Sequence, residues 1–417
     1  MKRWILGTLG MLLVFSCRTL PPPPPVRTLE EVTLKEIQNL ISSEEPTKAL
    51  QWIIGLRSST TPIKIPQEEL ERLEKEAKEK LIEKFYRAVE ASDFSYALSL
   101  YTSFRTLYGS EGFKEYSVNR LRFLLAESER QKGNAVLALA HFRGMTDWDS
   151  LSSEELFIYA NLALDLKNLP VCRAILKELE HRNASIHKDL KERANLTIPL
   201  ADYLGGTVTI WVNRGIRMDR GIGVPDRVIG SGFYIDPRGY LLTNYHVIQS
   251  EVDPEYEGYS RLFIRPSGRI DERIPAKVIG YDRIFDIALL KTEVSPSFLF
   301  GVSDVQELKV GSRIYALGSP GGLENTITSG IVSAVGRRFF QLGDAMQMDV
   351  PVNPGSSGGP LIDEEGRLIG IVFAGIEQFQ GVNFAIPAYW IQKILPDLYK
   401  PGEVVHSWMG VSVQEVR

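Results

Sequence analysis

Apolar residues recur at helical spacing through the first half of the chain. Within Glu68 to Ala91, one helical face carries Leu70, Leu73, Ala77, Leu81, Ile82 and Phe85. Short polar breaks interrupt the pattern, and each precedes a small residue inside the next expected helix. The breaks are 44–46, 91–93, 132–134 and 167–170, and the small residues are Ala49, Ala97, Ala138 and Ala174. This pattern predicts an array of α-helical hairpins over residues 28–200.

From Thr207 onward the pattern changes to short runs rich in Val and Ile, which Gly, Pro and Asp turns separate. Strands at this spacing are typical of an all-β sandwich or barrel. A closing helix is expected over residues 387–398, packed through Trp390, Ile391, Ile394 and Leu395. The predicted fold class is therefore multidomain α and β, with the helical array preceding the β domain.

The helical array resembles tetratricopeptide repeats, whose period is about 34 residues, although the period drifts in this chain. The resemblance implies a concave face that could receive a partner peptide. We favour core packing over a peptide-binding stripe as the explanation for the aromatic residues of this half. The three histidines here, His141, His181 and His187, lack the spacing of metal ligands, so no metal is expected.

The segment Asn353 to Leu361 has the composition of a loop built around a hydroxyl nucleophile. Gly355 allows a sharp turn that would aim its N–H beside that of Ser357, and Gly358 keeps the space around the hydroxyl open. A Gly/Ser/Pro turn in a β-protein is the alternative. A base and an acid elsewhere decide between them: His246 ends an apolar strand, and Asp286 opens another. The chain order His, Asp, Ser is that of chymotrypsin.

Four motifs together resemble the HtrA (Deg) family of trypsin-like serine proteases. They are 230–233 with 243–247, 286–291, 353–361 and 381–387, and the similarity covers roughly residues 204–398. The resemblance implies a chymotrypsin-like double β-barrel of two six-stranded barrels. It also implies His246 as general base, Asp286 as its orienting acid, Ser357 as nucleophile, and the N–H groups of Gly355 and Ser357 as the oxyanion hole. Ser356 departs from the usual Asn, which we do not interpret as inactivating.

In the trypsin-like fold the base of the specificity pocket lies six residues before the nucleophile, at Pro351 here. Val382, Asn383 and Phe384 would contribute to its walls. An apolar pocket predicts cleavage after small or medium aliphatic residues. Asp349 is the competing possibility, because a loop register that differs by two residues would bring its carboxylate to the pocket.

The amino terminus resembles a bacterial lipoprotein signal. Lys2 and Arg3 precede an apolar run that is too short to span a membrane, and residues 14–17 resemble a lipobox. Residues 1–16 would be removed, Cys17 would be lipidated as a membrane anchor, and 17–27 would form a proline-rich tether. A plain signal peptide is the alternative. Cys172 then lacks a partner and is expected to be buried and unreactive.

The composition gives no reason to expect nucleic acid as a partner, because the net charge is −4 and basic residues are not clustered with aromatics. No cofactor is needed for the implied chemistry. Residues 399–417 resemble the opening of a PDZ domain, and control would then come from the helical half or from a homo-oligomer, for which a trimer is the candidate.

The sequence therefore predicts a serine endopeptidase of the bacterial cell envelope, with residues 201–398 as its protease domain and an acyl-enzyme mechanism. Its expected partners are unfolded or specific protein substrates, which it would degrade or process. The alternative is a non-enzymatic chaperone or scaffold in which the helical array binds partners.

Overall fold

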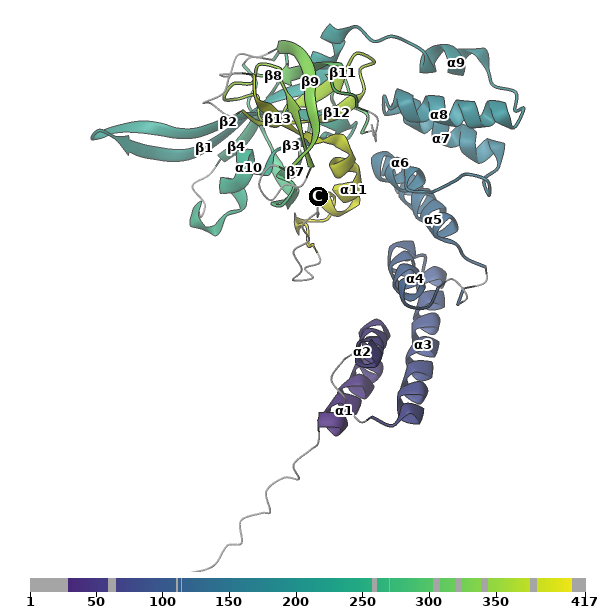
Figure 1. Ribbon diagram of the computed structural model, residues 1–417. Helices are drawn as coiled ribbons and strands as arrows, with labels where there is room; N and C mark the ends of the chain where they lie inside the picture. The colour runs from purple at the N-terminus through teal and green to yellow at the C-terminus, as the bar shows by residue number, and fades with distance from the viewer. Residues whose placement is uncertain are drawn as a thin grey trace, which may run out of the picture. The chain divides into compact units, whose positions relative to one another are not determined.

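The structure, a computed structural model, describes residues 29–406 except 59–64, 110–111, 114, 257–260, 270, 303–307, 320–324, 339–343 and 376–380. Cys17 and the tail from residue 407 lie outside the described residues. The chain divides into two compact units, 1–114 and 115–417 (Figure 1). Among the helices described, none has both the length and the apolar character that crossing a bilayer requires.

The first unit consists of four helices. They are α1 (Leu29–Ser42), α2 (Pro46–Ser58), α3 (Gln67–Glu90) and α4 (Phe94–Tyr108). The expected apolar face of α3 is buried, except that Ile82 is only partly covered and Glu74 and Ala88 join the buried positions. The ring of Phe113 packs against that of Phe85 at a tilt, with centroids 4.3 Å apart, and so attaches the segment after α4 to this core.

The second unit begins with five helices, which precede the β structure. They are α5 (Val118–Gln131), α6 (Ala135–Arg143), α7 (Ser153–Asp165), α8 (Leu169–His181) and α9 (Lys188–Ala194). Their buried residues form one continuous hydrophobic cluster with those of the first β-sheet, from Phe123 to Val404. The helical half predicted as one array is thus divided between two units, and its second part shares a core with the peptidase-like part.

The same turn precedes α2, α4, α6 and α8. A residue with positive φ ends the preceding helix at Glu44, Ser92, Gly133 and Lys167. The next N–H then bonds back five residues, for example from Asn168 to the carbonyl of Ala163 at 2.7 Å, which is the Schellman arrangement. Five residues after each positive φ lies a fully buried small residue: Ala49, Ala97, Ala138 and Cys172. The expectation of Ala174 at this position is wrong, because Ala174 is exposed and Cys172 takes its place.

The β structure consists of an eight-stranded sheet and a closed six-stranded barrel (Figure 1). The sheet has the order β14-β6-β7-β3-β2-β1-β4-β5 and the barrel the order β10-β13-β12-β11-β8-β9. The sheet strands are β1 (Thr207–Asp219), β2 (Ile222–Asp236), β3 (Tyr240–Thr243), β4 (Arg261–Pro266), β5 (Ile274–Pro275), β6 (Lys277–Asp282), β7 (Ile287–Lys291) and β14 (Gly402–Glu403). The barrel strands are β8 (Arg313–Gly318), β9 (Thr326–Arg338), β10 (Asp344–Met348), β11 (Pro360–Asp363), β12 (Leu368–Gly375) and β13 (Asn383–Pro387).

The expectation of two six-stranded barrels is confirmed for the second and modified for the first. In the first sheet, β5 pairs with β4 whereas β6 pairs with β7, and only Ala276 separates β5 from β6 in the chain. One bent stretch therefore connects the two sides of the sheet, where Pro275 lacks an N–H to continue the ladder. The remaining strand, β14, is added at the edge of β6 by the segment after the closing helix α11 (Ala388–Leu398).

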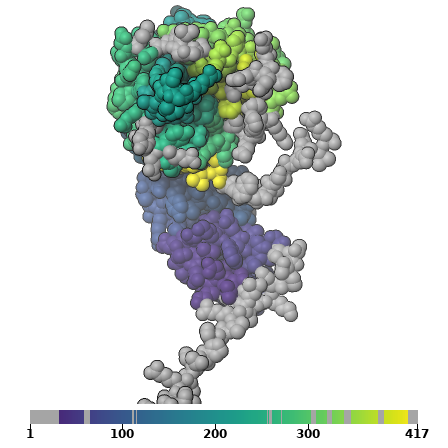
Figure 2. Space-filling view, turned by 90° about the vertical axis from the view of Figure 1, so that its left-hand side faces the viewer, coloured from purple at the N-terminus to yellow at the C-terminus, as the bar shows by residue number. Residues whose placement is uncertain are grey.

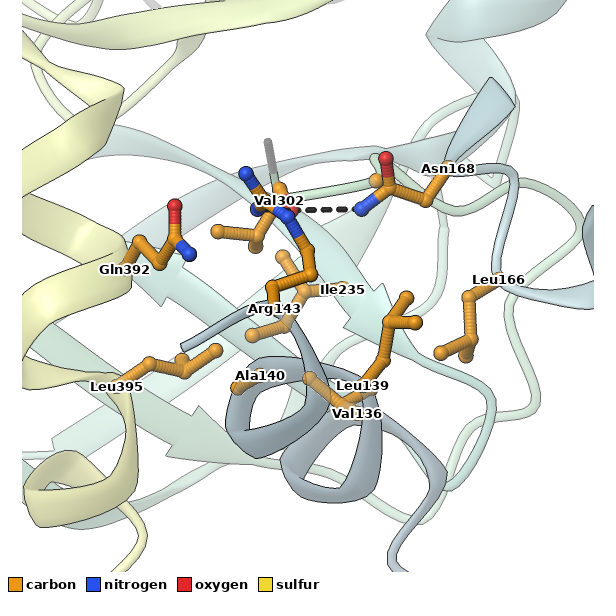
Figure 3. Close-up of a pocket in the computed structure, with 11 residues that line it drawn as sticks. Val136, Leu139, Ala140, Arg143, Leu166, Asn168, Ile235, Val302, Gln392 and Leu395 are labelled. Atoms are coloured by element: carbon orange, nitrogen blue, oxygen red, sulfur yellow. Dashed lines mark hydrogen bonds between the residues drawn. The ribbon is translucent and has the colours of Figure 1, made fainter. Parts of the chain in front are cut away.

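A small cavity of about 20 Å³ marks the junction between α6, β2 and α11 (Figure 3). The side-chain amide of Asn168 donates to the carbonyl of Val302 at 2.7 Å, and Arg143 donates to the same oxygen at 3.1 Å. Asn168 Oδ1 and Gln392 Oε1 are buried without a partner among the described residues. The space suffices for one water molecule, which these oxygens could bind.

The hairpin of β1 and β2 extends beyond the sheet, and Figure 2 shows its outer end facing the viewer. The two strands stay paired out to Asp219 and Ile222, whereas β4 accompanies β1 only as far as Asn213. Ile216 and Met218 are exposed on this outer part. The core of the first sheet thus ends where the pairing between β1 and β4 ends, at Asn213.

We predict that His141 makes stability depend on pH. Burial on α6 lowers the pKa of His141 from 6.5 to about 4, with Glu129 opposing the shift. The unfolded chain then binds more protons than the folded one below about pH 6.5, so the stability present above pH 6.5 falls as the pH drops to about 4. Between pH 6.5 and about 4, the wild type should therefore lose on the order of 2–3 kcal/mol of unfolding free energy that His141→Gln does not lose. Urea unfolding across this pH range tests it, and equal pH dependence in both proteins would contradict it.

Candidate active site

His246 and Asp286 form a two-point contact at one end of the first sheet. Asp286 Oδ2 lies 2.7 Å from His246 Nδ1, and its Oδ1 accepts the backbone N–H of His246 at 2.7 Å. His246 lies in the first turn of α10 (Tyr245–Val252), which follows β3 directly, rather than on the strand that the sequence suggested. The Asp286 carboxylate is buried, whereas the His246 side chain is 41% exposed. One side of the ring is therefore fixed and the other is accessible.

Hydrogen bonds also hold the backbone of Asp286 in place. Its carbonyl accepts the side-chain amide of Asn244 at 2.9 Å and the N–H of Tyr245 at 3.1 Å. Its φ is +53°, the left-handed region, which a non-glycine residue adopts only when its surroundings impose it. The end of β3 and the start of β7 therefore determine together where the carboxylate points.

Ser357 lies on a loop between β10 and β11 of the closed barrel, pressed against the first sheet. Ser231 of β2 donates its N–H to the carbonyl of Ser357 and its hydroxyl to the carbonyl of Gly355, both at 2.7 Å. Gly358 has φ +87°, and a Cβ there would lie 2.2 Å from the carbonyl oxygen of Ser231. A glycine is required at this point because the loop backbone touches β2.

The turn before Ser357 leaves two N–H groups available. Ser356 donates its N–H to the carbonyl of Asn353 at 2.9 Å, across Pro354 and Gly355 with φ +102° at the glycine. Pro at the second position and a positive-φ Gly at the third are typical of a type II turn. Among the described residues, neither Gly355 N–H nor Ser357 N–H donates a backbone hydrogen bond.

The hydroxyl of Ser357 donates to the carbonyl of Phe373 at 2.9 Å in this structure. The ladder between β12 and β13 is irregular between Val372 and Ala374, so Phe373 occupies a bulge. The Phe373 ring meets the His246 ring edge to face, with centroids 5.8 Å apart. Phe373 therefore contacts Ser357 through its carbonyl and His246 through its ring, and His246 is in turn bonded to Asp286.

The predicted pocket residues occupy different environments. Pro351 is exposed, Val382 partly buried, and Asn383 and Phe384 buried. Asn383 donates its side-chain amide to the carbonyl of Val350 at 2.7 Å, so this polar group is used within the protein. Asp349 Oδ1 accepts the N–H of Ile331 at 2.6 Å, which directs the carboxylate toward β9.

Three residues of the site were not singled out from the sequence for a role. Ser231 and Asn244 lie within the motifs that carry the family resemblance, so a signal for them existed. Phe373 lies in residues 371–374, which the sequence suggested as a pocket wall, but its bulge and its contacts with Ser357 and His246 were not expected, because a bulge depends on pairing between strands. Cys172 is fully buried and burial raises its pKa to about 11, which confirms the expectation of an unreactive thiol.

Residues 230–371 match the family model of the trypsin-like peptidase domain, and residues 28–124 match a domain of unknown function, DUF8517. A probable periplasmic serine endoprotease, DegP-like, from Hahella chejuensis is 40% identical over 192 residues, covering 45% of this chain and 39% of that protein. A DegP-like relative from Pseudomonas savastanoi is 32% identical over 289 residues, covering 65% of this chain and 58% of that protein. The chain thus spans less than two thirds of these relatives.

The comparison with solved structures also found proteases. The HtrA-type protease AlgW with a decapeptide is 26% identical, with TM-score 0.42, covering 52% of this chain and 71% of that one. The serine endoprotease from Yersinia pestis is 26% identical, with TM-score 0.37, covering 48% and 68%. The resemblance that the four motifs indicated is confirmed by the family match and the curated relatives. This chain carries a trypsin-like peptidase domain and is homologous, over that domain, to DegP-like HtrA proteases.

Proposed function

We propose that this chain is a serine endopeptidase in which Ser357 is the nucleophile, His246 the general base and Asp286 the residue that orients the base. The observation that carries the proposal is the double contact of Asp286 with the ring and backbone of His246, next to a serine loop whose N–H groups are available. A histidine with a purely structural role would not need a side chain that is 41% exposed.

The His246–Asp286 contact sets the tautomer of the base. An ionised carboxylate only accepts hydrogen bonds, so Nδ1 of the neutral ring carries the proton and Nε2 has a free lone pair. Nε2 can then take the proton of Ser357 as its oxygen attacks a peptide carbonyl. The resulting imidazolium is stabilised by Asp286 and returns the proton to the leaving amine. Water hydrolyses the acyl-enzyme by the same steps.

The hydroxyl of Ser357 must leave the carbonyl of Phe373 before it can donate to His246. We propose that the side chain rotates about χ1 to do so, while Ser231 and β12 hold the backbone around Ser357. The N–H groups of Gly355 and Ser357 are proposed to bind the oxyanion, because both belong to a loop that already fixes their direction.

We predict that Ser357→Ala abolishes peptidase activity, lowering turnover by a factor of about 10⁴ or more, while the fold persists because no core volume is lost. His246→Ala should be comparably severe, since triad members act as a unit. Digestion of casein measures the activity. The matched control is Ser356→Ala, whose hydroxyl makes only a 3.4 Å contact with the N–H of Asn353 in the serine loop.

Wild-type turnover in Ser357→Ala would contradict the assignment of the nucleophile. A wild-type protein that binds unfolded protein but does not cleave it would favour the non-enzymatic chaperone instead. Equal losses in Ser357→Ala and Ser356→Ala would indicate that the loop, and not the hydroxyl, had been disturbed.

We predict cleavage after small or medium aliphatic residues. The predicted pocket residues carry no charge: Pro351, Val382 and Phe384 are apolar, and the amide of Asn383 is already bonded to Val350. One oxygen of the Asp349 carboxylate is held by the N–H of Ile331 in β9. Burying Lys or Arg in this pocket would cost several kcal/mol, whereas an aliphatic side chain gains roughly 1.5–3 kcal/mol. Mass-spectrometric mapping of cleavage sites in a denatured protein tests this. A majority of cuts after Lys or Arg would overturn it and implicate Asp349.

We propose that the protein acts in the bacterial cell envelope on unfolded or specific proteins, supported by relatives that are named periplasmic endoproteases. Lipidation of Cys17 is the proposed anchor, and it rests on the sequence alone.

We predict that the mature protein begins at a lipidated Cys17 and partitions into the detergent phase. Phase separation and N-terminal mass spectrometry measure this, and identical partitioning of Cys17→Ala would contradict it.

A further inference from the structure

The segment after α11 returns along the first sheet, next to the turn that carries Asp286. β14 pairs in parallel with β6, and the N–H of Val404 donates to the carbonyl of Tyr281 at 2.8 Å. Gly280 makes this approach possible, because a Cβ there would lie 2.3 Å from the carbonyl oxygen of Leu398. We call residues 399–406 the C-terminal strap.

The strap ends at His406, which binds a buried carboxylate. His406 Nε2 lies 2.6 Å from Oδ2 of Asp282, a residue that is 0% exposed. The other oxygen, Oδ1, accepts the backbone N–H groups of Ile284 at 2.8 Å and Phe285 at 2.9 Å. A buried carboxylate requires such partners. Asp282 therefore links the strap to the turn that follows β6.

This turn leads directly into Asp286. Phe285, the residue before it, stacks on Trp390 of α11 with centroids 4.2 Å apart, and its ring meets that of His406 at 5.4 Å. Asp286 then adopts the left-handed conformation described above, with φ +53°. Because this conformation persists only when the surroundings impose it, the contacts that hold residues 282–285 also determine where the Asp286 carboxylate points.

We propose that His406 is a positioning residue for Asp286. It holds Asp282, Asp282 holds the backbone of the turn, and the turn aims Asp286 at His246. His406 acts through other residues and touches no reacting atom. The inference rests on the proposed peptidase function, since the orientation of Asp286 affects turnover only if His246 is the base.

Three variants test the proposal: His406→Ala, His406→Gln and, as a control, Val405→Ala. Gln can place an N–H donor where Nε2 lies, whereas Val405 is 91% exposed and next to His406 in the chain. We expect His406→Ala to lower kcat about five- to tenfold, the scale of one ordinary hydrogen bond, with KM changed less than about twofold. His406→Gln should recover most of kcat, and Val405→Ala should equal the wild type.

A second readout does not depend on turnover: the far-downfield proton resonance of the Nδ1–H shared by His246 and Asp286, assigned by its loss in His246→Ala. We expect this resonance to shift or broaden in His406→Ala and to return in His406→Gln. An unchanged kcat and resonance in His406→Ala, or equal losses in the Ala and Gln variants with a raised KM, would overturn the inference. An inactive wild type would contradict the peptidase function alone, and the resonance would then decide the role of His406.

Discussion

The contact between Ser231 and the serine loop is the constraint on which the site depends. His246 and Asp286 belong to the first sheet, whereas Ser357 belongs to the closed barrel, so their alignment requires a fixed joint between the two. Ser231 provides this joint with three hydrogen bonds. Its N–H donates to the carbonyl of Ser357, and its hydroxyl donates to the carbonyl of Gly355. The oxygen of the same hydroxyl accepts the N–H of Ser319 at 3.0 Å. Ser231 is fully buried, so each of its polar groups left without a bond would cost about 1–3 kcal/mol. Within the first sheet, Thr243 of β3 donates its hydroxyl to the carbonyl of Ser231.

The acid is held as firmly as the nucleophile, but by different elements. Asn244 and Tyr245 bind the carbonyl of Asp286 from the β3–α10 junction, and the turn from Asp282 approaches from β6. The hydroxyl of Ser357, by contrast, is bonded to the carbonyl of Phe373. In the proposed mechanism this hydroxyl must move to His246, while the backbone of the site is already held in place.

The sequence predicted those parts of the molecule that depend on residues close together in the chain. Gly355 and Gly358 stand where positive φ and backbone contact require them, and the closing helix shows its apolar face through Ile391, Ile394 and Leu395. Features that depend on long-range packing were not predictable: the helical start at His246, the bulge at Phe373, and the division of the helical half between two units. Cys172 illustrates the same limit, because only the Schellman turn at Lys167 shows that it, and not Ala174, is equivalent to Ala138.

The central claim is that the His246–Asp286 pair activates Ser357 in particular. Labelling with a fluorophosphonate, which reacts covalently with an activated serine hydroxyl, followed by peptide mass spectrometry of the full chain, tests this claim without assuming any protein substrate. The account predicts one modified residue, Ser357, in the wild type and its loss in His246→Ala. Modification of another residue, or labelling of Ser357 that persists at the wild-type rate in His246→Ala, would contradict it.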